Sequence, residues 1–394
     1  MTPAARTQAA IDLLDAIIGA ARDGGASADV LIARGFAARR YAGSKDRRAI
    51  RGLIYDAIRL CGERPESGRA ALLALAARDP ALAATFDGSG YGAAAIREGE
   101  PVAQAGIAPM WLMDALASSG IDAAQAAALL DRAPLDLRVN RLKADPAQVR
   151  AELPEAADIP GLPDALRLPA DTQVEATEAY GVGGIEVQDA GSQIVTLAGG
   201  AAPGMRVIDL CAGAGGKTLA LAAAMANQGT LLATDTDRTR LSRLMPRAQR
   251  AGVSIVETRL LNPGRELEPL ADWTDSADVV LVDAPCSGTG TWRRNPEARW
   301  RLTPARLAKL VETQARLLDV AATLVKPGGT LIHIVCSLLD AEGADQAAAF
   351  LARHPHWAAA PLALPAGTPH GSGMRLTPLS HSTDGFFVAK LVRA

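Results

Sequence analysis

The sequence predicts an α/β fold built on a Rossmann-like parallel sheet, and three observations support this prediction. After about residue 200, short apolar segments alternate with segments whose apolar residues have helical spacing, which indicates parallel strands covered by helices on both faces. The first strand runs into a glycine-rich turn, DLCAGAGGK (209–217), at a position where open α/β sheets bind ligands. Two further apolar segments within 373–394 predict an antiparallel C-terminal hairpin.

Two regions precede this sheet. Residues 1–130 are rich in alanine and repeat apolar residues at helical spacing, as in AAIDLLDAIIGAAR (9–22), which predicts a helical domain. A glycine-rich stretch at 84–106 predicts a loop within it. Residues 131–185 consist of short alternating pieces and predict a small mixed α/β subdomain. The sheet then occupies 186–394.

The elements of the sheet region follow one another in a regular order. Pro246 predicts a kink in the second helix, and KPGG (326–329) predicts the end of the third, which Thr303 and Pro304 begin. The expected strands are 206–210, 230–235, 253–259, 278–285 and 330–336, and the expected helices are 217–227, 237–252 and 303–325.

Composition indicates a soluble globular protein. The chain has 394 residues, of which 49% are hydrophobic and 21% charged, and no apolar run approaches the ~20 residues that cross a membrane. The N-terminus lacks the long apolar core of a signal peptide, so we expect a cytoplasmic protein. We also expect a monomer. The four cysteines show no CxxC pair or zinc-ligand spacing, which argues against a metal site and against disulfides.

The charge pattern is ambiguous about a nucleic-acid partner. The formal net charge is −2, whereas nucleic-acid binders usually carry a basic surface. The arginines, however, gather in three clusters, at 36–51, 237–250 and 292–301. A single cluster is commonly a solvated helix face, but three of them favour a polyanionic partner.

The glycine-rich turn can be compared with three ligand-binding patterns. A phosphate-binding Walker A loop needs a glycine where this chain has Cys211, and a dinucleotide fingerprint needs one at Thr218. The looser pattern for S-adenosyl-L-methionine (SAM), acid-x-x-x-G-x-G-G, is satisfied by Asp209 through Gly216. Asp235 ends the second strand, where an acid would hold the ribose hydroxyls. The sequence therefore predicts a SAM site.

Two cysteines, Cys286 and Cys336, end two later strands of the same sheet. Carbon 5 of a pyrimidine is a poor nucleophile, and a thiolate that adds to carbon 6 activates it for methylation. A second group would then help the thiolate leave. Asp283, three residues before Cys286, could hydrogen-bond the N3/N4 edge of the base. Together these residues favour covalent catalysis of methyl transfer.

Four segments follow one another in the second half of the chain: DLCAGAGGKTLAL, ATDTD, DAPCSGTGTWRRNPEARW and VCSLLDAEG. In this order they resemble the Sun/RsmB-type family of RNA (cytosine-5) methyltransferases. LRVN (137–140), VQDAGSQ (187–193) and DGFFVAKL (384–391) also resemble this family, so that the resemblance covers about 135–394. The N-terminal helices resemble the family's NusB-like RNA-binding domain in a shortened form.

The resemblance implies a class I methyltransferase fold with its catalytic domain at 186–394, and it implies roles for individual residues. Cys336 would be the nucleophile, Cys286 would aid release of the product, and Asp283 would contact the cytosine and line the cofactor site. Asp235 would bind the ribose of SAM and Asn262 its adenine. The remaining SAM-lining residues would be Cys211, Ala212, Gly213, Ala214, Gly215, Gly216 and Lys217, and RNA phosphate would be met by Arg293, Arg294 and Arg299.

Three positions depart from the family pattern. Gly213-Ala214 replaces the family's common Ala-Pro, Val335 stands where a threonine commonly precedes the nucleophile, and Asn262 stands where an aspartate is common. The substitution at 335 removes a hydroxyl group beside the thiolate. The substitution at 262 leaves an amide to meet the adenine.

The expected substrate is RNA, with ribosomal RNA favoured and transfer RNA as the alternative. A DNA cytosine-5 methyltransferase would use Cys286 as its nucleophile, but the second cysteine argues against this reading. A SAM-binding RNA assembly factor with weak catalysis would have no need of both thiols and Asp283. A small-molecule methyltransferase would leave the helical domain and the arginine clusters unexplained.

Overall fold

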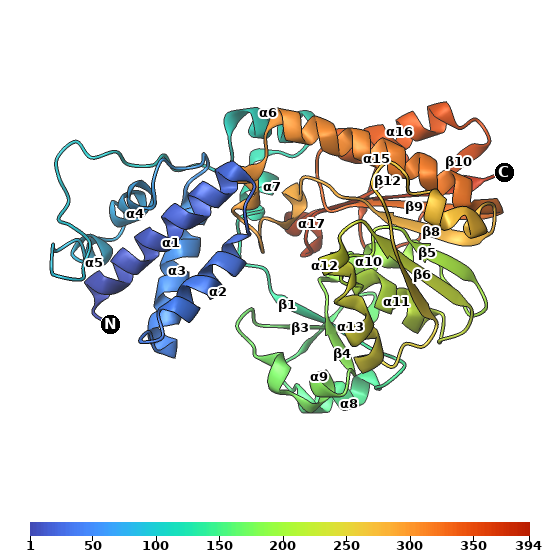
Figure 1. The fold of residues 1–394 in the computed structure, drawn as a ribbon, viewed down its shortest axis with the longest axis horizontal. Helices are drawn as coiled ribbons and strands as arrows, with labels where there is room; N and C mark the ends of the chain where they lie inside the picture. The colour runs from blue at the N-terminus through green and yellow to red at the C-terminus, as the bar shows by residue number, and fades with distance from the viewer. The chain divides into compact units, whose positions relative to one another are not determined.

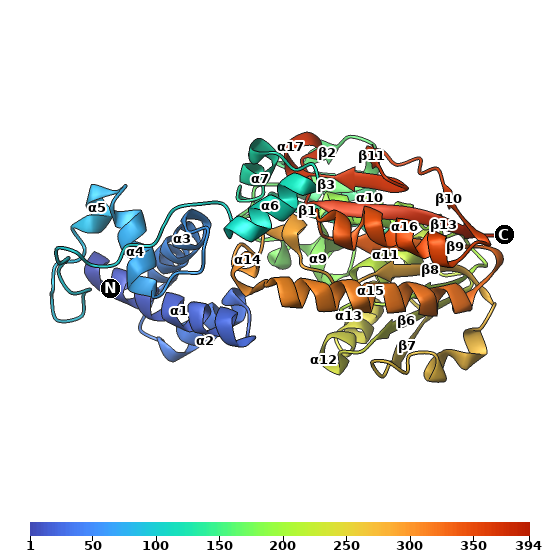
Figure 2. The ribbon, with the colours of Figure 1, turned by 90° about the horizontal axis from the view of Figure 1, so that it is seen from above.

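A computed structural model describes residues 1–394, which form two compact units that are described separately here (Figures 1 and 2). The first unit is Met1–Asp131 together with Thr291–Thr303, and the second is Arg132–Gly290 together with Pro304–Ala394. The small α/β region predicted at 131–185 therefore groups with the sheet, and a short segment of the sheet region groups with the N-terminal helices. No helix combines the length and the apolar character needed to span a bilayer.

The first unit is helical, as its sequence predicts. Apolar faces of α1, α3 and α4 form its core, and Trp300 of α14 belongs to the same core although it lies far along the chain. The predicted loop at 84–106 contains no helix, and only an isolated bridge between Cys61 and Ala105. The helices are α1 (Pro3–Asp23), α2 (Ala28–Ala38), α3 (Ser44–Leu60), α4 (Gly68–Ala76), α5 (Pro80–Ala83), α6 (Met110–Ser118), α7 (Ala123–Ala128) and α14 (Ala298–Arg301).

The second unit begins with a small antiparallel sheet in the order β2-β3-β1-β4. Its helices α8 and α9 cover a core that includes Leu137, Val149 and Leu166. The elements are β1 (Leu135–Val139), α8 (Pro146–Glu152), β2 (Ala157–Ile159), β3 (Leu162–Leu168), the 3-10 turn η1 (Val174–Ala176), α9 (Glu178–Gly181) and β4 (Ile185–Val187).

The large sheet has the strand order β11-β12-β13-β9-β8-β5-β6-β7, with β10 pairing on β13. Strands β5 to β9 are parallel, whereas β13 runs antiparallel to both β9 and β12, so the predicted antiparallel C-terminal strands are present. The strands are β5 (Arg206–Asp209), β6 (Thr230–Asp235), β7 (Val256–Leu260), β8 (Ala277–Asp283), β9 (Val325–Val335), β10 (Trp357–Ala360), β11 (Thr368–His370), β12 (Gly373–Leu376) and β13 (Phe386–Arg393).

Helices cover both faces of this sheet, which confirms the predicted fold class (Figures 1 and 2). Successive strand residues point to opposite faces, so Val207 packs with α10, α11 and α13 while Ile208 packs with α15. The helices are α10 (Ala190–Leu197), α11 (Gly216–Ala224), α12 (Arg238–Leu241), α13 (Leu244–Arg250), α15 (Pro304–Leu324), α16 (Ala344–Arg353) and α17 (Pro378–His381), and the 3-10 turns are η2 (Glu268–Trp273), η3 (Thr289–Thr291) and η4 (Asp340–Glu342).

Two local predictions need correction. The helix expected at 237–252 is broken after Leu241 rather than kinked at Pro246, which lies in the first turn of α13, where a missing N–H leaves no helical bond unmade. KPGG does not separate α15 from the following strand, because β9 already begins at Val325. It forms a bulge instead, since β8 pairing shifts from Ala277↔Val325 to Val279↔Thr330.

Candidate functional site

The glycine-rich loop 211–215 joins the end of β5 to α11, at the carboxyl edge of the sheet. Gly213 and Gly215 have φ of 56° and 88°, a conformation that favours glycine, and Gly215 is the N-cap of α11. A Cβ added to Gly215 would lie 2.7 Å from Leu244 Cγ, whereas one added to Gly216 would meet nothing within 4 Å. The loop therefore needs its glycines and leaves open space beside the helix N-terminus.

Asp235, the last residue of β6, holds this loop from the neighbouring strand. Its Oδ2 accepts a hydrogen bond from the Gly213 amide at 2.8 Å, and its Oδ1 accepts one from the Asp237 amide at 2.7 Å. A carboxylate has further lone pairs for a ligand hydroxyl. Asn262 follows β7 at the same edge of the sheet, and its side chain is exposed.

Asp209, the acid of the SAM pattern, lies under the loop rather than on its surface. It is fully buried, and its Oδ2 accepts a hydrogen bond from the Thr218 hydroxyl at 2.6 Å. Burial raises the pKa of this carboxyl to about 7, although the Thr218 bond opposes the shift. Its Oδ1 is buried without a hydrogen-bond partner.

Lys217, the last residue of the loop motif, reaches the next strand. Its Nζ donates a hydrogen bond to Asp283 Oδ2 at 2.7 Å and lies 5.6 Å from the ring centre of Phe386. Burial alone would lower the pKa of Lys217, but Asp283 and then Cys336 raise it above its ordinary value. Lys217 is thus held as an ammonium between a carboxylate and a thiol.

The two cysteines are brought into contact. Cys286 follows β8 and Cys336 follows β9, and because these strands are parallel neighbours the two Sγ atoms lie 3.3 Å apart. The Cys336 hydrogen bond, followed by burial, raises the pKa of the Cys286 thiol well above its ordinary value. Either sulfur can donate in this contact, and Cys336 also lies near the Lys217 charge.

A buried carboxylate, Glu342, fixes the loop that carries Cys286. Its side chain accepts hydrogen bonds from the Ser287 amide at 2.8 Å, from the Ser287 hydroxyl, and from Gln314 Nε2 at 3.0 Å. Gln314 also donates to the Pro285 carbonyl at 2.9 Å. The hydroxyl groups of Ser287 and Thr289 then meet that of Ser337, next to Cys336, at 3.2 and 3.0 Å.

The C-terminal DGFF segment packs directly under this loop. The Gly385 amide donates to the Gly290 carbonyl at 2.8 Å, and a Cβ on Gly290 would lie 2.1 Å from the Gly385 carbonyl oxygen. Both positions therefore require glycine. Phe386, the next residue, is the ring beside Lys217. The DGFF motif, to which the sequence alone assigns no function, therefore lies beside the candidate site.

One predicted RNA contact is wrong. Arg299 is fully buried within the first unit, and its guanidinium donates to the carbonyls of Ile58 at 2.5 Å and Cys61 at 3.0 Å at the end of α3. It caps a helix C-terminus and does not face solvent. Arg293 is also largely buried and Arg294 half-buried, and their contact with RNA stays a prediction.

The sequence predicts that these residues lie at one edge of the sheet, as they do in the structure. It does not reveal the side chains that hold them there. Lys217 and Asp283 form an ion pair, although the sequence predicts separate roles for them, in the cofactor loop and at the cytosine. Glu342 lies in VCSLLDAEG, a segment already noted for Cys336, so the motif itself contained the signal. Gln314 belongs to a long amphipathic helix and offered no signal.

Comparisons with known proteins agree with this geometry. Residues 200–392 match the family model of the 16S rRNA methyltransferase RsmB/F. This part of the chain, just under half of its length, is therefore similar to the RsmB/F family. The probable ribosomal RNA small subunit methyltransferase B of Synechocystis sp. is 39% identical over 273 residues, which cover 66% of this chain and 60% of that protein. The chain thus spans less than two thirds of the relative's length.

Solved structures extend the likeness of the fold beyond the RsmB/F region. The protein PH0851 matches 99% of this chain and 99% of its own, with 26% identity and a TM-score of 0.78. A methyltransferase homologue from Pyrococcus horikoshii matches 72% of this chain and 99% of its own, with 25% identity and a TM-score of 0.60. The first likeness covers nearly the whole chain and therefore includes the sheet that carries the two thiols.

Proposed function

We propose that this chain methylates carbon 5 of a cytosine in RNA, with SAM as the methyl donor and Cys336 as the nucleophile. The observation that supports this most directly is the contact between Cys336 and a protonated Cys286, 3.3 Å apart, beside the Lys217–Asp283 ion pair. Methylation of an oxygen or an amine needs no thiol, whereas methylation of a pyrimidine carbon does.

The residues of the glycine loop fit SAM. The backbone of Gly216 is open at the start of α11, and Asp235 ends the adjacent strand with acceptor capacity for ribose hydroxyls. Asn262 would meet the adenine at the next strand end, and the loop residues from Cys211 to Lys217 would line the cofactor. When bound, SAM supplies an electrophilic methyl group.

The protein's own groups act on the cytosine. The Cys336 thiolate forms a bond to carbon 6, and the electrons of the C5–C6 double bond move towards carbon 5, which becomes nucleophilic. The second oxygen of Asp283, which is not bonded to Lys217, is available to the N3/N4 edge of the base. After methylation, water removes the carbon-5 proton, the double bond re-forms and the C6–S bond breaks. The Cys286 thiol is placed to hydrogen-bond the departing Cys336 thiolate.

The same contact weighs against a DNA-type reaction in which Cys286 attacks. The pKa of the Cys286 thiol is raised by Cys336, by burial and by nearby Glu342. The attacking species in covalent catalysis is the thiolate, so a raised pKa disfavours attack by Cys286. The proposal therefore gives the attack to Cys336.

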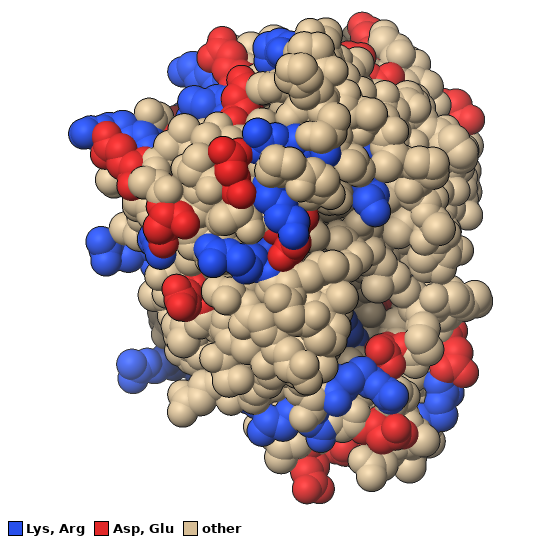
Figure 3. All heavy atoms as spheres, turned by 90° about the vertical axis from the view of Figure 1, so that its right-hand side faces the viewer, with Lys and Arg blue, Asp and Glu red and all other residues tan.

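Charge in the first unit supports an RNA partner. Residues 34–51 contain seven Lys and Arg side chains and one acid, Asp46, which already pairs with Arg6 at 2.8 Å. Tyr41 in the same segment is 72% exposed and could stack on a base. The face drawn in Figure 3, by contrast, mixes both signs of charge without a continuous field. The name of the Synechocystis relative favours ribosomal RNA over transfer RNA.

Two substitutions test the assignment of the thiols. Cys336→Ala should abolish methylation of RNA, a loss of at least about 10³-fold, because carbon 5 is no longer activated. Cys286→Ala should retain attack but slow release, so that a denaturant-resistant RNA–protein adduct accumulates. Transfer of a labelled methyl group to ribosomal RNA and denaturing electrophoresis measure the two effects.

Cys61→Ala is the matched control, since Cys61 is a buried thiol of the helical unit and should leave both readouts unchanged. The double variant Cys286→Ala/Cys336→Ala should form no adduct. Full activity in Cys336→Ala, or an adduct that persists in the double variant, would refute the proposed roles.

A further inference from the structure

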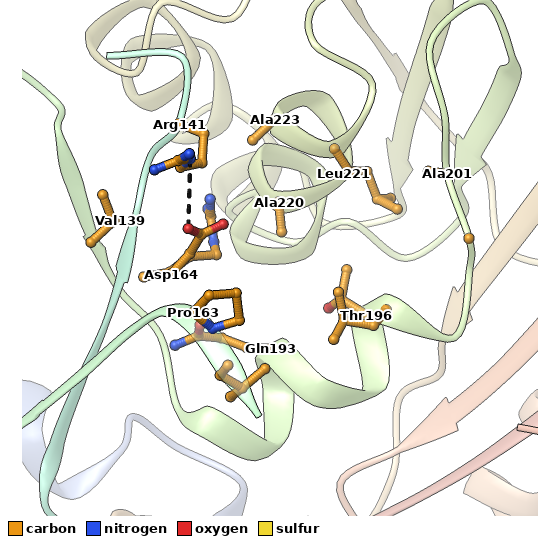
Figure 4. A pocket seen from close by; sticks show the side chains of 15 residues that line it. Val139, Arg141, Pro163, Asp164, Gln193, Thr196, Ala201, Ala220, Leu221 and Ala223 are labelled. Carbon is orange, nitrogen blue, oxygen red and sulfur yellow. Dashed lines mark ion pairs between the residues drawn. The ribbon is translucent and has the colours of Figure 1, made fainter. Parts of the chain in front are cut away.

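A cavity of 240 Å³ lies within the second unit, between the small antiparallel sheet and helices α10 and α11 (Figure 4). Its walls come from Val139 and Pro163 on one side and from Ala220, Leu221 and Thr196 on the other. Most of this lining is apolar. The cavity is separate from the two thiols, although Ala220 lies one helical turn beyond Lys217.

One charged group in this apolar wall has no ionic partner. Arg138 is 8% exposed, and its Nε donates to Gln188 Oε1 at 2.7 Å. Its Nη2 is buried with no hydrogen-bond partner, and no carboxylate forms an ion pair with its guanidinium. Burial lowers the pKa of Arg138 to about 10, so it is still charged at neutral pH. Buried charges in proteins are normally paired.

We propose that this cavity binds a small amphipathic carboxylate, with the carboxylate on Arg138 and the apolar body along α10 and α11. An unsatisfied guanidinium N–H donates a charge-assisted hydrogen bond to a carboxylate, and the apolar wall contacts hydrocarbon. The volume corresponds to about eight water-sized units, and a cavity of about 150 Å³ already holds benzene. A chain of about eight carbon atoms therefore fits. This proposal is independent of the proposed methyltransferase activity.

Two acids attract the Arg138 guanidinium through space, Glu186 more than Asp164, but neither forms an ion pair with it. Asp164, which also lines the cavity, lies 3.6 Å from Arg141, and Figure 4 shows this ion pair at the cavity wall. Glu186 is engaged by Arg247 at 2.6 Å and by Arg250 at 2.5 Å. Asp164 is the acid among the lining residues, so it would repel an incoming carboxylate. Its removal should strengthen binding.

Isothermal titration of the full chain with octanoate, 1-octanol and octylamine tests the proposal. Octanoate should bind with a stoichiometry of one and at least about tenfold more tightly than 1-octanol, and octylamine should not bind. Arg138→Met should remove the preference for octanoate over 1-octanol. Ala220→Leu, which fills the cavity from α11, should weaken both ligands by about tenfold or more.

Asp164→Asn is the matched charge variant and should tighten octanoate binding while leaving 1-octanol unchanged. Thermal unfolding of each variant establishes that it is folded, and Ala220→Leu and Asp164→Asn keep the test valid if Arg138→Met unfolds. Equal binding of octanoate and 1-octanol by the wild-type chain, no binding of either, or octanoate binding unaffected by Ala220→Leu would each overturn the proposal.

Discussion

Two loops meet at the active edge of the sheet, and they are held in place by different means. The loop 211–215 owes its shape to backbone conformation, with glycines at φ of 56° and 88° and a single anchoring carboxylate, Asp235. The loop 284–290 owes its shape to side chains from other elements, above all Glu342 and Gln314. In the proposed reaction the first loop would contact the cofactor, and the second would carry the thiol that aids release of the product.

The difference explains why one loop is easy to recognise in a sequence and the other is not. A glycine that must adopt positive φ can be recognised at its own position in the sequence. A buried side chain that supports a distant loop stands elsewhere in the sequence, and Glu342 and Ser287 are 55 residues apart. Substitutions that act on only one of the two loops should separate cofactor binding from catalysis.

Among substitutions that act on one loop without removing a thiol, the largest effect is expected for Glu342→Ala. The Ser287 amide and the Gln314 amide group would lose a buried acceptor, at about 1–3 kcal/mol of unfolding free energy for each unsatisfied group. Displacement of Cys286 by about 1 Å would slow release of the product, and with it multiple-turnover methylation, by about 100-fold. The dissociation constant of SAM should stay unchanged, because Glu342 has no bond to the glycine loop. Multiple-turnover methylation at saturating SAM and SAM titration measure the two effects.

Glu312→Ala is the control for this experiment, since Glu312 is an exposed acid on α15, the helix that carries Gln314. It should leave both quantities unchanged. Weakened SAM binding in Glu342→Ala that equals the loss of rate would show that the two loops are not separate.

A smaller and opposite effect is expected for Gly215→Ala. The new Cβ would lie 2.7 Å from Leu244 Cγ at a φ of 88°, so the loop must shift. Overpacking of this kind costs about 1–3 kcal/mol of unfolding free energy. SAM should bind about tenfold more weakly, whereas the methylation rate at saturating SAM should fall less than in Glu342→Ala.

Gly204→Ala provides the matched control, because Gly204 has the same φ of 88° and a Cβ there would meet nothing within 4 Å. It should show the cost of the backbone conformation alone, about 1 kcal/mol. If Gly204→Ala weakens SAM binding as much as Gly215→Ala, the close approach to Leu244 is not the cause.

The smallest effect concerns the pH dependence of stability. Burial raises the pKa of Asp209 to about 7, so between pH ~4 and ~7 the native state holds a proton that the unfolded chain has released. Stability therefore falls as pH rises through this window, by up to about 1.4 kcal/mol per pH unit. Asp209→Asn should remove this slope. Urea unfolding at pH 5 and pH 7 measures it, and parallel slopes for the two proteins would contradict the assignment.

Much of the fold could be predicted because its signals are local. Buried parallel strands show as apolar runs, so β5, β6 and β8 were found within a residue or two of their ends. The sequence does not predict the break after Leu241 or the bulge in β9. Pro246 and KPGG indicate an irregular backbone, but they do not show at which residue the helix breaks or the strand bulges. Local sequence places such signals without fixing their geometry.

The candidate site was predictable to the extent that its residues end strands. Cys286, Cys336 and Asp283 follow directly from the strand pattern, and parallel strands bring their ends to one edge. Arg299 was misplaced because an arginine cluster looks the same in a sequence whether it faces solvent or caps a helix. Only tertiary contact distinguishes the two environments.

The burial of Arg299 and Trp300 among the N-terminal helices also bears on how the chain folds. Residues 1–131 alone lack the guanidinium that meets the end of α3 and the indole that donates to the Cys61 carbonyl at 3.1 Å. During synthesis the core of the helical unit is therefore completed only by residues 291–303, which are made after strands β5 to β8. A single cut in the chain cannot separate the two units, because the polypeptide leaves the first, returns to complete it, and leaves again.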